Sequence, residues 1–334
     1  MAAKSNEMQA LVCVEPGRLE LGQRPRPEDR PGHIRLKVEA IGICGTDYHI
    51  FGGNQPFLAY PRVMGHELAA RALQDSADGT IARGDLVVVN PYITCGACHA
   101  CRIGKPNCCE NIGVLGVHRD GGMCEEIVVP ESNVYGATGL DATAAAMVEF
   151  LAIGAHGVRR SRLAAETTAL VVGAGPIGMG AALFAHVAGA RVTLRDTSPE
   201  RLSLAQSILP DVTCESVAAA GPGTFDTVFD ATGNINAMNA GLGFLAHGGS
   251  YVLLSVVKGD LSFPDPEFHK REATLIGSRN ALEEDFRHVM DCMAKGLVPV
   301  AAIATHRTTL EGAKADLPKW AEDRNTVMKA LIHV

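Results

Sequence analysis

The sequence predicts an α/β protein with two domains: the first is rich in antiparallel β-strands, and the second contains a parallel sheet. A chain of 334 residues is long enough for two domains of ordinary size. Up to residue 148, short segments of alternating apolar and polar residues are separated by Gly and Pro turns. After Asp141, short apolar segments alternate with Ala-rich helical segments, a pattern typical of a parallel sheet with crossover helices.

In the first part, turns at residues 15–17 and 30–32 bound the early strands. The expected strands there are residues 11–14, 34–38, 85–89 and 125–129. In the second part, the expected strands are residues 169–172, 191–195, 227–231, 250–257 and 273–277. The expected helices are residues 176–188, 200–207 and 283–295, with strand-like segments from there to the C-terminus.

Composition excludes several classes of protein. Lys and Arg number 30 against 37 Asp and Glu, which gives a net charge of −7, whereas a nucleic-acid partner would require a basic face. No apolar stretch approaches the roughly 18 residues of a membrane span, and the N-terminus lacks the apolar core of a signal peptide. We therefore expect a cytoplasmic protein that binds neither nucleic acid nor membrane.

A glycine pattern follows the first strand of the second part. The G-x-G-x-x-G pattern is formed by Gly173, Ala174, Gly175, Pro176, Ile177 and Gly178. Gly173 permits a tight turn, Gly175 lets the backbone approach a pyrophosphate, and Gly178 lets the next helix pack against the strand. Because the start of that helix also favours a phosphate group, this segment predicts a Rossmann-type dinucleotide site.

Asp196 ends the next expected strand, about 20 residues after the glycine pattern. A carboxylate there accepts hydrogen bonds from the adenosine ribose and repels a 2′-phosphate, which favours NAD over NADP. Arg195 keeps a dual preference open, and Asp196 is alternatively a cap of the following helix. Arg201 is a candidate for stacking on the adenine, or else a solvated surface charge.

Five of the ten cysteines fall within a short loop. Four of them, Cys95, Cys98, Cys101 and Cys109, have the spacing of a tetrahedral zinc site. Four protein ligands leave no position for a substrate, so this zinc is expected to be structural. Cys108 is a spare thiol beside a ligand, or a competitor for the metal.

A second group of candidate ligands is spread along the sequence. Cys44, His66 and Glu149 provide one thiolate, one imidazole and one carboxylate. Three protein ligands leave a fourth position for water or an alcohol, as in catalytic zinc sites. Each residue alone is equally consistent with an ordinary buried Cys, a core His and a surface Glu.

These segments together resemble the zinc-dependent medium-chain alcohol and polyol dehydrogenases over nearly the whole chain. The matching segments are GICGTDYHI, GHE, the four-cysteine loop, VVGAGPIG, DATG and the strand around residues 328–332. The resemblance implies a GroES-like domain at residues 1–148, a Rossmann NAD-binding domain at 149–278 and a C-terminal return to the first domain at 279–334. It also implies that Thr232 contacts the cofactor, and that the chain forms a homotetramer or homodimer.

Longer segments resemble a narrower group, the bacterial L-galactonate and L-gulonate 5-dehydrogenases, which oxidise the C5 hydroxyl of a hexonate with NAD. These segments are GGNQPFLAYPRVMGHE, NCCENIGVLGVHRDGG, FPDPEFHKREATLIGSRNA and ATHR at residues 304–307. At one position the chain departs from the family, which usually has Pro after the zinc-binding Glu. Here Phe150 follows Glu149, and because Pro restricts its neighbour's backbone, this departure bears on where Glu149 points.

The resemblance also implies how the alcohol loses its proton. Zinc bound by Cys44, His66 and Glu149 would lower the pKa of the substrate hydroxyl, and the hydride would pass to the nicotinamide. Thr46 and His49 match the relay positions of the family, with Thr46 taking the proton and His49 passing it to solvent. Glu67 is the alternative zinc ligand, or a charge behind the metal.

A hexonate carries a carboxylate, which requires a cation or several hydrogen-bond donors. The candidates are His118, Arg119 and Arg279, while Asn54 and Gln55 are candidates for sugar hydroxyls. The alternative substrate is a neutral polyol or an amino alcohol such as sorbitol or threonine, which needs no carboxylate-binding group. A more remote alternative is a zinc ribbon that binds protein or nucleic acid.

Overall fold

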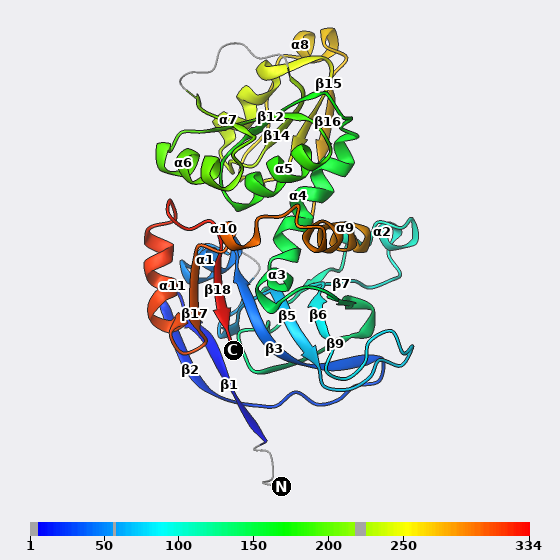
Figure 1. The fold of residues 1–334 in the computed structure, drawn as a ribbon, viewed down its shortest axis with the longest axis vertical. Coiled ribbons are helices and arrows are strands. Elements are labelled where there is room, and N and C mark those ends of the chain that lie inside the picture. Colours follow the sequence, from blue (N-terminus) through cyan, green and yellow to red (C-terminus); the bar gives the residue numbers. More distant parts are fainter. Residues whose placement is uncertain (1–5, 56–57, 218–224) are drawn as a thin grey trace. The chain divides into compact units, whose positions relative to one another are not determined.

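The computed structural model describes residues 6–55, 58–217 and 225–334 (Figure 1). The chain divides into two units. The first comprises Met1–Glu149, Met290–Lys295 and Ile303–Val334, and the second comprises Phe150–Val289 and Gly296–Ala302. Among the described residues, no helix has the length and apolar character needed to cross a membrane.

The first unit is built around a long central strand, β3 (His33–Ile43). Buried side chains at Ile34, Leu36 and Val38 alternate with less buried ones, which is the period of a strand with one face in the core. The sheet has the order β10-β6-β5-β3-β18-β17, and β9 also pairs with β3. Its other strands are β5 (Glu67–Ala72), β6 (Leu86–Val89), β9 (Glu126–Pro130), β10 (Val134–Gly136), β17 (His306–Thr309) and β18 (Ala330–His333).

Two smaller sheets complete the β-structure of this unit. One has the order β2-β1-β4 and is antiparallel, and the other is the antiparallel pair β7-β8. These strands are β1 (Glu7–Glu15), β2 (Arg18–Pro25), β4 (Arg62–Val63), β7 (Tyr92–Ile93) and β8 (Gly113–Val114). The predicted antiparallel β-rich first part is therefore present, with the parallel pair β17-β18 as an addition.

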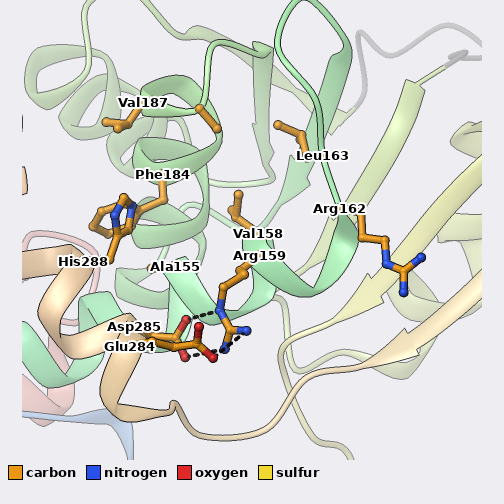
Figure 2. Close-up of a pocket in the computed structure, with 11 residues that line it drawn as sticks. Ala155, Val158, Arg159, Arg162, Leu163, Phe184, Val187, Glu284, Asp285 and His288 are labelled. Carbon is orange, nitrogen blue, oxygen red and sulfur yellow. Dashed lines mark hydrogen bonds and ion pairs between the residues drawn. The ribbon is translucent and has the colours of Figure 1, made fainter.

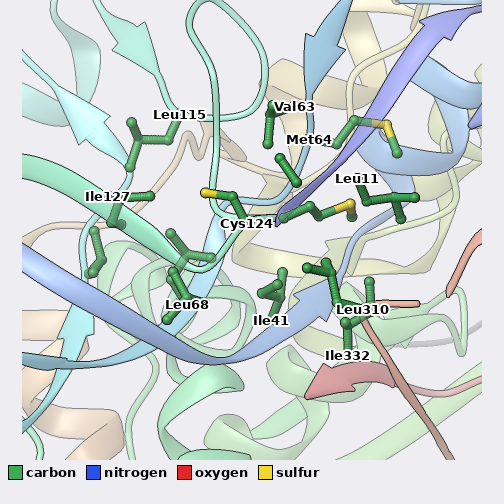
Figure 3. Packing of buried hydrophobic residues seen from close by; sticks show 14 of the residues in the cluster. Leu11, Ile41, Val63, Met64, Leu68, Leu115, Cys124, Ile127, Leu310 and Ile332 are labelled. Atoms are coloured by element: carbon green, nitrogen blue, oxygen red, sulfur yellow. The ribbon is translucent and has the colours of Figure 1, made fainter. Parts of the chain in front are cut away.

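Residues from both ends of the chain share one hydrophobic core in this unit (Figure 3). Leu11 of β1, Leu68 of β5 and Ile332 of β18 are each 0 % exposed. Full burial of one such side chain contributes about 1.5–3 kcal/mol. The C-terminal strand is thus part of the first unit's core, and it also pairs with β3 from Ala330 to His333.

After residue 295 the structure contains helices that the sequence pattern did not predict. They are α10 (Val300–Ile303) and α11 (Ala313–Glu322). In α11 the buried residues Ala313, Leu317 and Trp320 have helical spacing, but Pro318 lies inside the helix. Because Pro normally ends or kinks a helix, it masked this periodicity in the sequence.

The second unit contains a six-stranded parallel sheet with the order β13-β12-β11-β14-β15-β16. Numbered along the chain, this is the 3-2-1-4-5-6 order of a Rossmann fold, whose ligand crevice lies beside the first strand. The strands are β11 (Thr168–Val172), β12 (Arg191–Asp196), β13 (Thr213–Ser216), β14 (Phe225–Asp230), β15 (Leu245–Leu253) and β16 (Thr274–Gly277). The helices that follow strands include α5 (Pro176–Val187), α6 (Pro199–Ile208), α7 (Ile235–Ala240) and α8 (Asp265–Lys270).

Two strand predictions in this unit differ from the structure. The strand expected at residues 250–257 begins earlier and ends at Leu253. Beyond it, Val256 is 93 % exposed, so the apolar run continues into a loop and not into the sheet. The short strand β13 was missed because its sequence TCES is mostly polar and sits at the edge of the sheet.

Candidate active site

The four-cysteine loop lies between strands β7 and β8. The Sγ atoms of Cys95, Cys98, Cys101 and Cys109 all lie within 4.8 Å of one another. Backbone N–H groups of residues 97 and 98 donate to Cys95 and lower the pKa of this thiol to about 6. Four thiol groups in one closed cluster are the donor set that a structural zinc ion prefers, so these residues fit the metal. The fifth thiol, Cys108, is exposed and is not part of this cluster.

A second cluster of ligand atoms is assembled from two segments of the first unit. Cys44 precedes helix α1 (Gly45–Phe51), while His66 and Glu67 lie at the start of β5. Their ligand atoms also lie within 4.8 Å of one another. Both His66 and Glu67 are buried, at 5 % and 0 % exposure. The fold therefore brings Cys44 and His66 together with Glu67, the alternative carboxylate of the sequence prediction, and not with the preferred Glu149.

Asp47 holds these two segments together. Its carboxylate accepts hydrogen bonds from Cys44 N at 2.9 Å and from Gly65 N at 3.2 Å. Its Oδ1 also lies 3.9 Å from His66 Nδ1. Although burial lowers the pKa of His66, the charges of Cys44 and Asp47 outweigh this effect and hold it well above its usual value. A carboxylate behind a metal-binding His commonly fixes the orientation of its ring.

Glu67 is paired with Lys329, the residue directly before the C-terminal strand β18. Lys329 Nζ donates to Glu67 Oε1 and Oε2 at 2.8 Å each, and to Ile43 O at 3.2 Å. Both side chains of the ion pair are almost completely buried. Because an unpaired charge is costly in such an environment, the lysine compensates the carboxylate next to Cys44 and His66.

Glu149 lies in the first turn of α4 (Val148–Ser161) and is also buried. Its Oε1 accepts a hydrogen bond from the hydroxyl of Tyr92. Burial raises the pKa of Glu149 to about 7, although the charge of His66 opposes this rise. Within the described part of the chain, Glu149 Oε2 is buried without a hydrogen-bond partner. This unpaired oxygen fits a bound cation, but Glu149 lies outside the set whose ligand atoms are all within 4.8 Å.

The structure therefore adds residues that sequence reasoning missed. Asp47 belongs to the matching segment GICGTDYHI, and its position three residues after Cys44 was an available signal. Lys329 is a single charge within the apolar segment at residues 327–332, which is unusual enough to have indicated a buried partner. Tyr92 gave no signal, because its contact with Glu149 joins residues 57 positions apart.

The two predicted relay residues follow Cys44 on helix α1. Thr46 is half-buried and His49 is exposed. Because they are three residues apart, they lie on the same side of the helix. Partial burial and the charge of Arg324 lower the pKa of His49, so the imidazole is neutral at pH 7 and able to accept a proton.

The glycine pattern connects β11 to α5 in the second unit. Gly173 has φ +103°, a conformation that favours glycine, and a Cβ on Gly178 would lie 1.8 Å from Gly173 O. Both positions therefore require glycine. A Cβ on Gly173 would also approach Thr232 N at 3.2 Å, so Thr232 borders the turn. At Gly175, a Cβ would meet the guanidinium of Arg201 at 3.9 Å.

Asp196 lies beside this turn, and its Oδ2 accepts a hydrogen bond from Ala174 N at 2.7 Å. Its Oδ1 accepts from Ser198 N at 2.8 Å, so the side chain also caps the following turn. The neighbouring Arg195 is buried, donates from Nε to Glu215 at 2.6 Å and packs against two phenylalanine rings. Its guanidinium is thus engaged in the interior of the unit.

The candidate substrate residues are spread over the two units. Asn54 follows α1 and is exposed, as are His118 and Arg119. His118 Nδ1 accepts a hydrogen bond from Val114 N at 3.0 Å, so His118 is bound to strand β8. Arg279 is exposed and follows β16 in the second unit.

A pocket of about 380 Å³ lies in the second unit between α4, α5 and α9 (Glu283–Ala294) (Figure 2). Its lining includes the apolar side chains Val158 and Phe184. Within this lining, Arg159 binds Asp285 Oδ1 at 2.7 Å and Glu284 Oε1 at 2.9 Å. These three charged side chains thus pair with one another, and none of the predicted site residues belongs to the described lining.

Comparison with known proteins matches both parts of the chain to domains of dehydrogenases. Residues 30–138 match the alcohol dehydrogenase GroES-like domain family, and residues 176–295 match the zinc-binding dehydrogenase family. The chain is 44% identical to an L-galactonate-5-dehydrogenase of Escherichia coli strain K12, covering 90% of this chain and 91% of that protein. It is 31% identical to a D-altritol 5-dehydrogenase of Agrobacterium fabrum, over 91% of this chain and 93% of that protein.

A solved structure extends this similarity to the fold. The alcohol dehydrogenase RspB of Escherichia coli CFT073, solved with NADH, has a TM-score of 0.89 and 27% identity. The match covers 99% of this chain and 100% of that chain. The chain therefore belongs to the zinc-binding alcohol dehydrogenase family, whose members are oxidoreductases acting on CH–OH groups.

Proposed function

We propose that this chain oxidises the C5 hydroxyl of a hexonate of the L-galactonate or L-gulonate type to a keto acid, with NAD as the hydride acceptor. The observation that carries this proposal is the 44% identity to an L-galactonate-5-dehydrogenase over 90% of the chain. The cluster of Cys44, His66 and buried carboxylates supplies a matching metal centre. The glycine turn with Asp196 supplies a matching dinucleotide site.

The metal centre is proposed to consist of Cys44, His66 and Glu149. Glu149 is preferred over Glu67 because its Oε2 is buried without a partner in the described structure, whereas Lys329 binds both oxygens of Glu67. The shorter approach of Glu67 to Cys44 and His66 supports the alternative. Zinc content distinguishes them, because Glu149→Gln should lose the catalytic ion and Glu67→Gln should keep it.

When bound, zinc would lower the pKa of the substrate hydroxyl, and NAD would accept the hydride as the C–OH carbon becomes a ketone. Within the protein, the Thr46 hydroxyl accepts the proton that the alcohol loses and releases its own proton in the same step. His49, neutral at pH 7, passes that proton to solvent. One hydride and one proton thus leave the substrate in each turnover.

The cofactor preference is proposed to depend on Asp196. Its carboxylate beside Ala174 N places a negative charge at the turn, which disfavours the 2′-phosphate of NADP. Arg195 is buried against Glu215 and two aromatic rings, which argues against its binding that phosphate. Asp196→Ala should therefore relax the preference for NAD. If the wild type uses NADP better than NAD, the proposed role of Asp196 is wrong.

The carboxylate of the hexonate is proposed to bind one or more of His118, Arg119 and Arg279. The test of the substrate is an NAD-reduction assay with L-galactonate, L-gulonate, D-altritol, sorbitol and L-threonine, with NADP in parallel. Oxidation of the aldonates alone supports the proposal. Oxidation of D-altritol or sorbitol alone would favour the neutral polyol alternative, for which the 31% identity to a D-altritol 5-dehydrogenase is the supporting observation. The predicted homo-oligomer, a dimer or tetramer, is tested by sedimentation.

A further inference from the structure

Tyr92 is held rigidly at the start of the segment that leads to the four-cysteine loop. Its N–H donates to Asn90 Oδ1 at 3.0 Å, and its carbonyl accepts from Asn133 Nδ2 at 3.1 Å. Asn133 Nδ2 also donates to Asn90 O at 2.9 Å, which ties the two asparagines together. The Tyr92 side chain is only 6 % exposed. Its hydroxyl is therefore presented from a fixed backbone in a buried environment.

This hydroxyl contacts Glu149, the proposed carboxylate ligand. Glu149 is followed by Phe150, which does not restrict the Glu149 backbone as Pro would. The Glu149 side chain has several rotatable bonds, and a hydrogen bond to one oxygen restricts the direction of its carboxylate. Tyr92 donates to Oε1, and Oε2 stays buried without a hydrogen-bond partner in the described structure.

We propose that Tyr92 is a positioning residue that binds Glu149 Oε1, so that Glu149 offers the catalytic metal a single oxygen, Oε2. This inference rests on the proposed function, because it assumes that Cys44, His66 and Glu149 hold the catalytic ion. One thiolate, one imidazole and one carboxylate oxygen leave an open position for the substrate. A carboxylate that bound through both oxygens would fill that position.

The contrast with Glu67 supports this assignment. Lys329 donates to both oxygens of Glu67, so neither oxygen of that carboxylate is without a hydrogen bond. Tyr92 has only one hydroxyl proton and donates it to one oxygen of Glu149. A neutral phenol leaves the negative charge of Glu149 available for a cation, whereas an ammonium group compensates it.

The test is Tyr92→Phe, which removes only the hydroxyl, with the metal itself as the probe. Zinc and cobalt binding to the Cys44 site are measured by chelator competition and by the visible d–d absorption of cobalt. Loss of a partner behind a metal ligand typically weakens metal affinity by about 10–100-fold, and we expect a change in this range with an altered cobalt spectrum. The thiolate-to-cobalt absorption of the four-cysteine site should not change. Tyr92→His, which keeps a ring N–H donor, should recover part of the affinity.

Tyr251→Phe is the matched control, since it removes a buried hydroxyl that donates to Met238 O at 2.7 Å in the second unit. It should leave both metal sites unchanged. Wild-type affinity and spectrum in Tyr92→Phe would overturn the positioning role. If Tyr92→Phe does not fold, a crystal structure of the zinc-loaded wild type decides. A retained Tyr92–Glu149 bond with one oxygen on the metal supports the role, and a broken bond or two bound oxygens overturns it. Failure of the wild type to bind two metal ions would instead contradict the proposed function.

Discussion

The two candidate metal centres of the first unit are built in opposite ways. The four-cysteine cluster lies within one loop from Cys95 to Cys109, and its donors are all thiols. The second cluster joins Cys44 and His66 to carboxylates that lie in β5 and α4. It is buried and surrounded by charge, with Asp47 and Lys329 among its partners. A closed site therefore needs only a loop of the right spacing, whereas an open site depends on the surrounding fold.

Removing one thiol from each centre gives the largest expected difference. Cys44→Ser should lose the catalytic ion while the protein stays folded. Because a metal ion stabilises the transition state by several kcal/mol, turnover should fall on the order of a thousand-fold. Cys98→Ser should instead lose the structural ion and lower the melting temperature, because structural zinc contributes directly to folding.

Metal analysis and thermal unfolding of the two variants check this contrast. The wild type should contain two zinc ions per chain, and each variant should contain one. The contrast fails if Cys44→Ser retains both ions, or if Cys98→Ser keeps the wild-type melting temperature.

Replacing Lys329, which pairs with Glu67 at the buried centre, gives the next largest expected effect. Lys329→Met leaves the buried carboxylate of Glu67 without its cation, which should reduce the free energy of unfolding by about 3–5 kcal/mol. Urea denaturation measures this change. Glu67→Gln in the same chain should recover most of it, since the uncompensated charge is then gone. Wild-type stability of the single Lys329→Met variant would contradict the assigned role of Lys329 in compensating this carboxylate.

Variants of the two proposed relay residues test proton transfer separately from metal binding at the same centre. Thr46→Ala should lower kcat at neutral pH by about 100-fold or more, a typical contribution of general acid–base catalysis. His49→Gln should have a smaller effect, because imidazole buffers can replace an exposed proton acceptor but cannot replace Thr46. Zinc content should be unchanged in both variants. Loss of zinc from His49→Gln, or near-normal turnover of Thr46→Ala, would exclude this relay.

Much of the site was predictable from sequence because its signals are local. The spacing of the four cysteines predicts one metal cluster, and the glycine pattern predicts the Rossmann turn, without any information from distant residues. Helix α11 was missed because Pro318 obscures a helical pattern of buried residues, which shows how one breaker can outweigh correct periodicity. The strand prediction at residues 250–257 extended too far because apolar character does not reveal whether Val256 has anything to pack against.

The partners of the buried centre were not predictable in the same way. Lys329 and Glu67 are 262 positions apart, and Tyr92 and Glu149 are 57 positions apart. Such pairs depend on which strands become neighbours, and a single sequence contains no direct record of this. The sequence therefore identified Glu149 and Glu67 as alternatives, and the proposal of Glu149 depends on their different partners in the fold.

The smallest expected effect concerns the charge that acts on His49. Partial burial and Arg324 both lower the pKa of His49, and only its neutral form accepts a proton, so oxidation should decline as the pH falls through this pKa. Arg324→Gln removes a positive charge, which should raise the pKa and move the acid limb of the kcat profile to higher pH. The shift should be about half a pH unit, as expected for one charge acting at a partly solvated site. Arg324→Lys keeps the charge and should keep the wild-type limb. An unchanged limb in Arg324→Gln would mean that another group controls the proton transfer. A shift of that limb to lower pH would be opposite to the electrostatic effect assigned to Arg324.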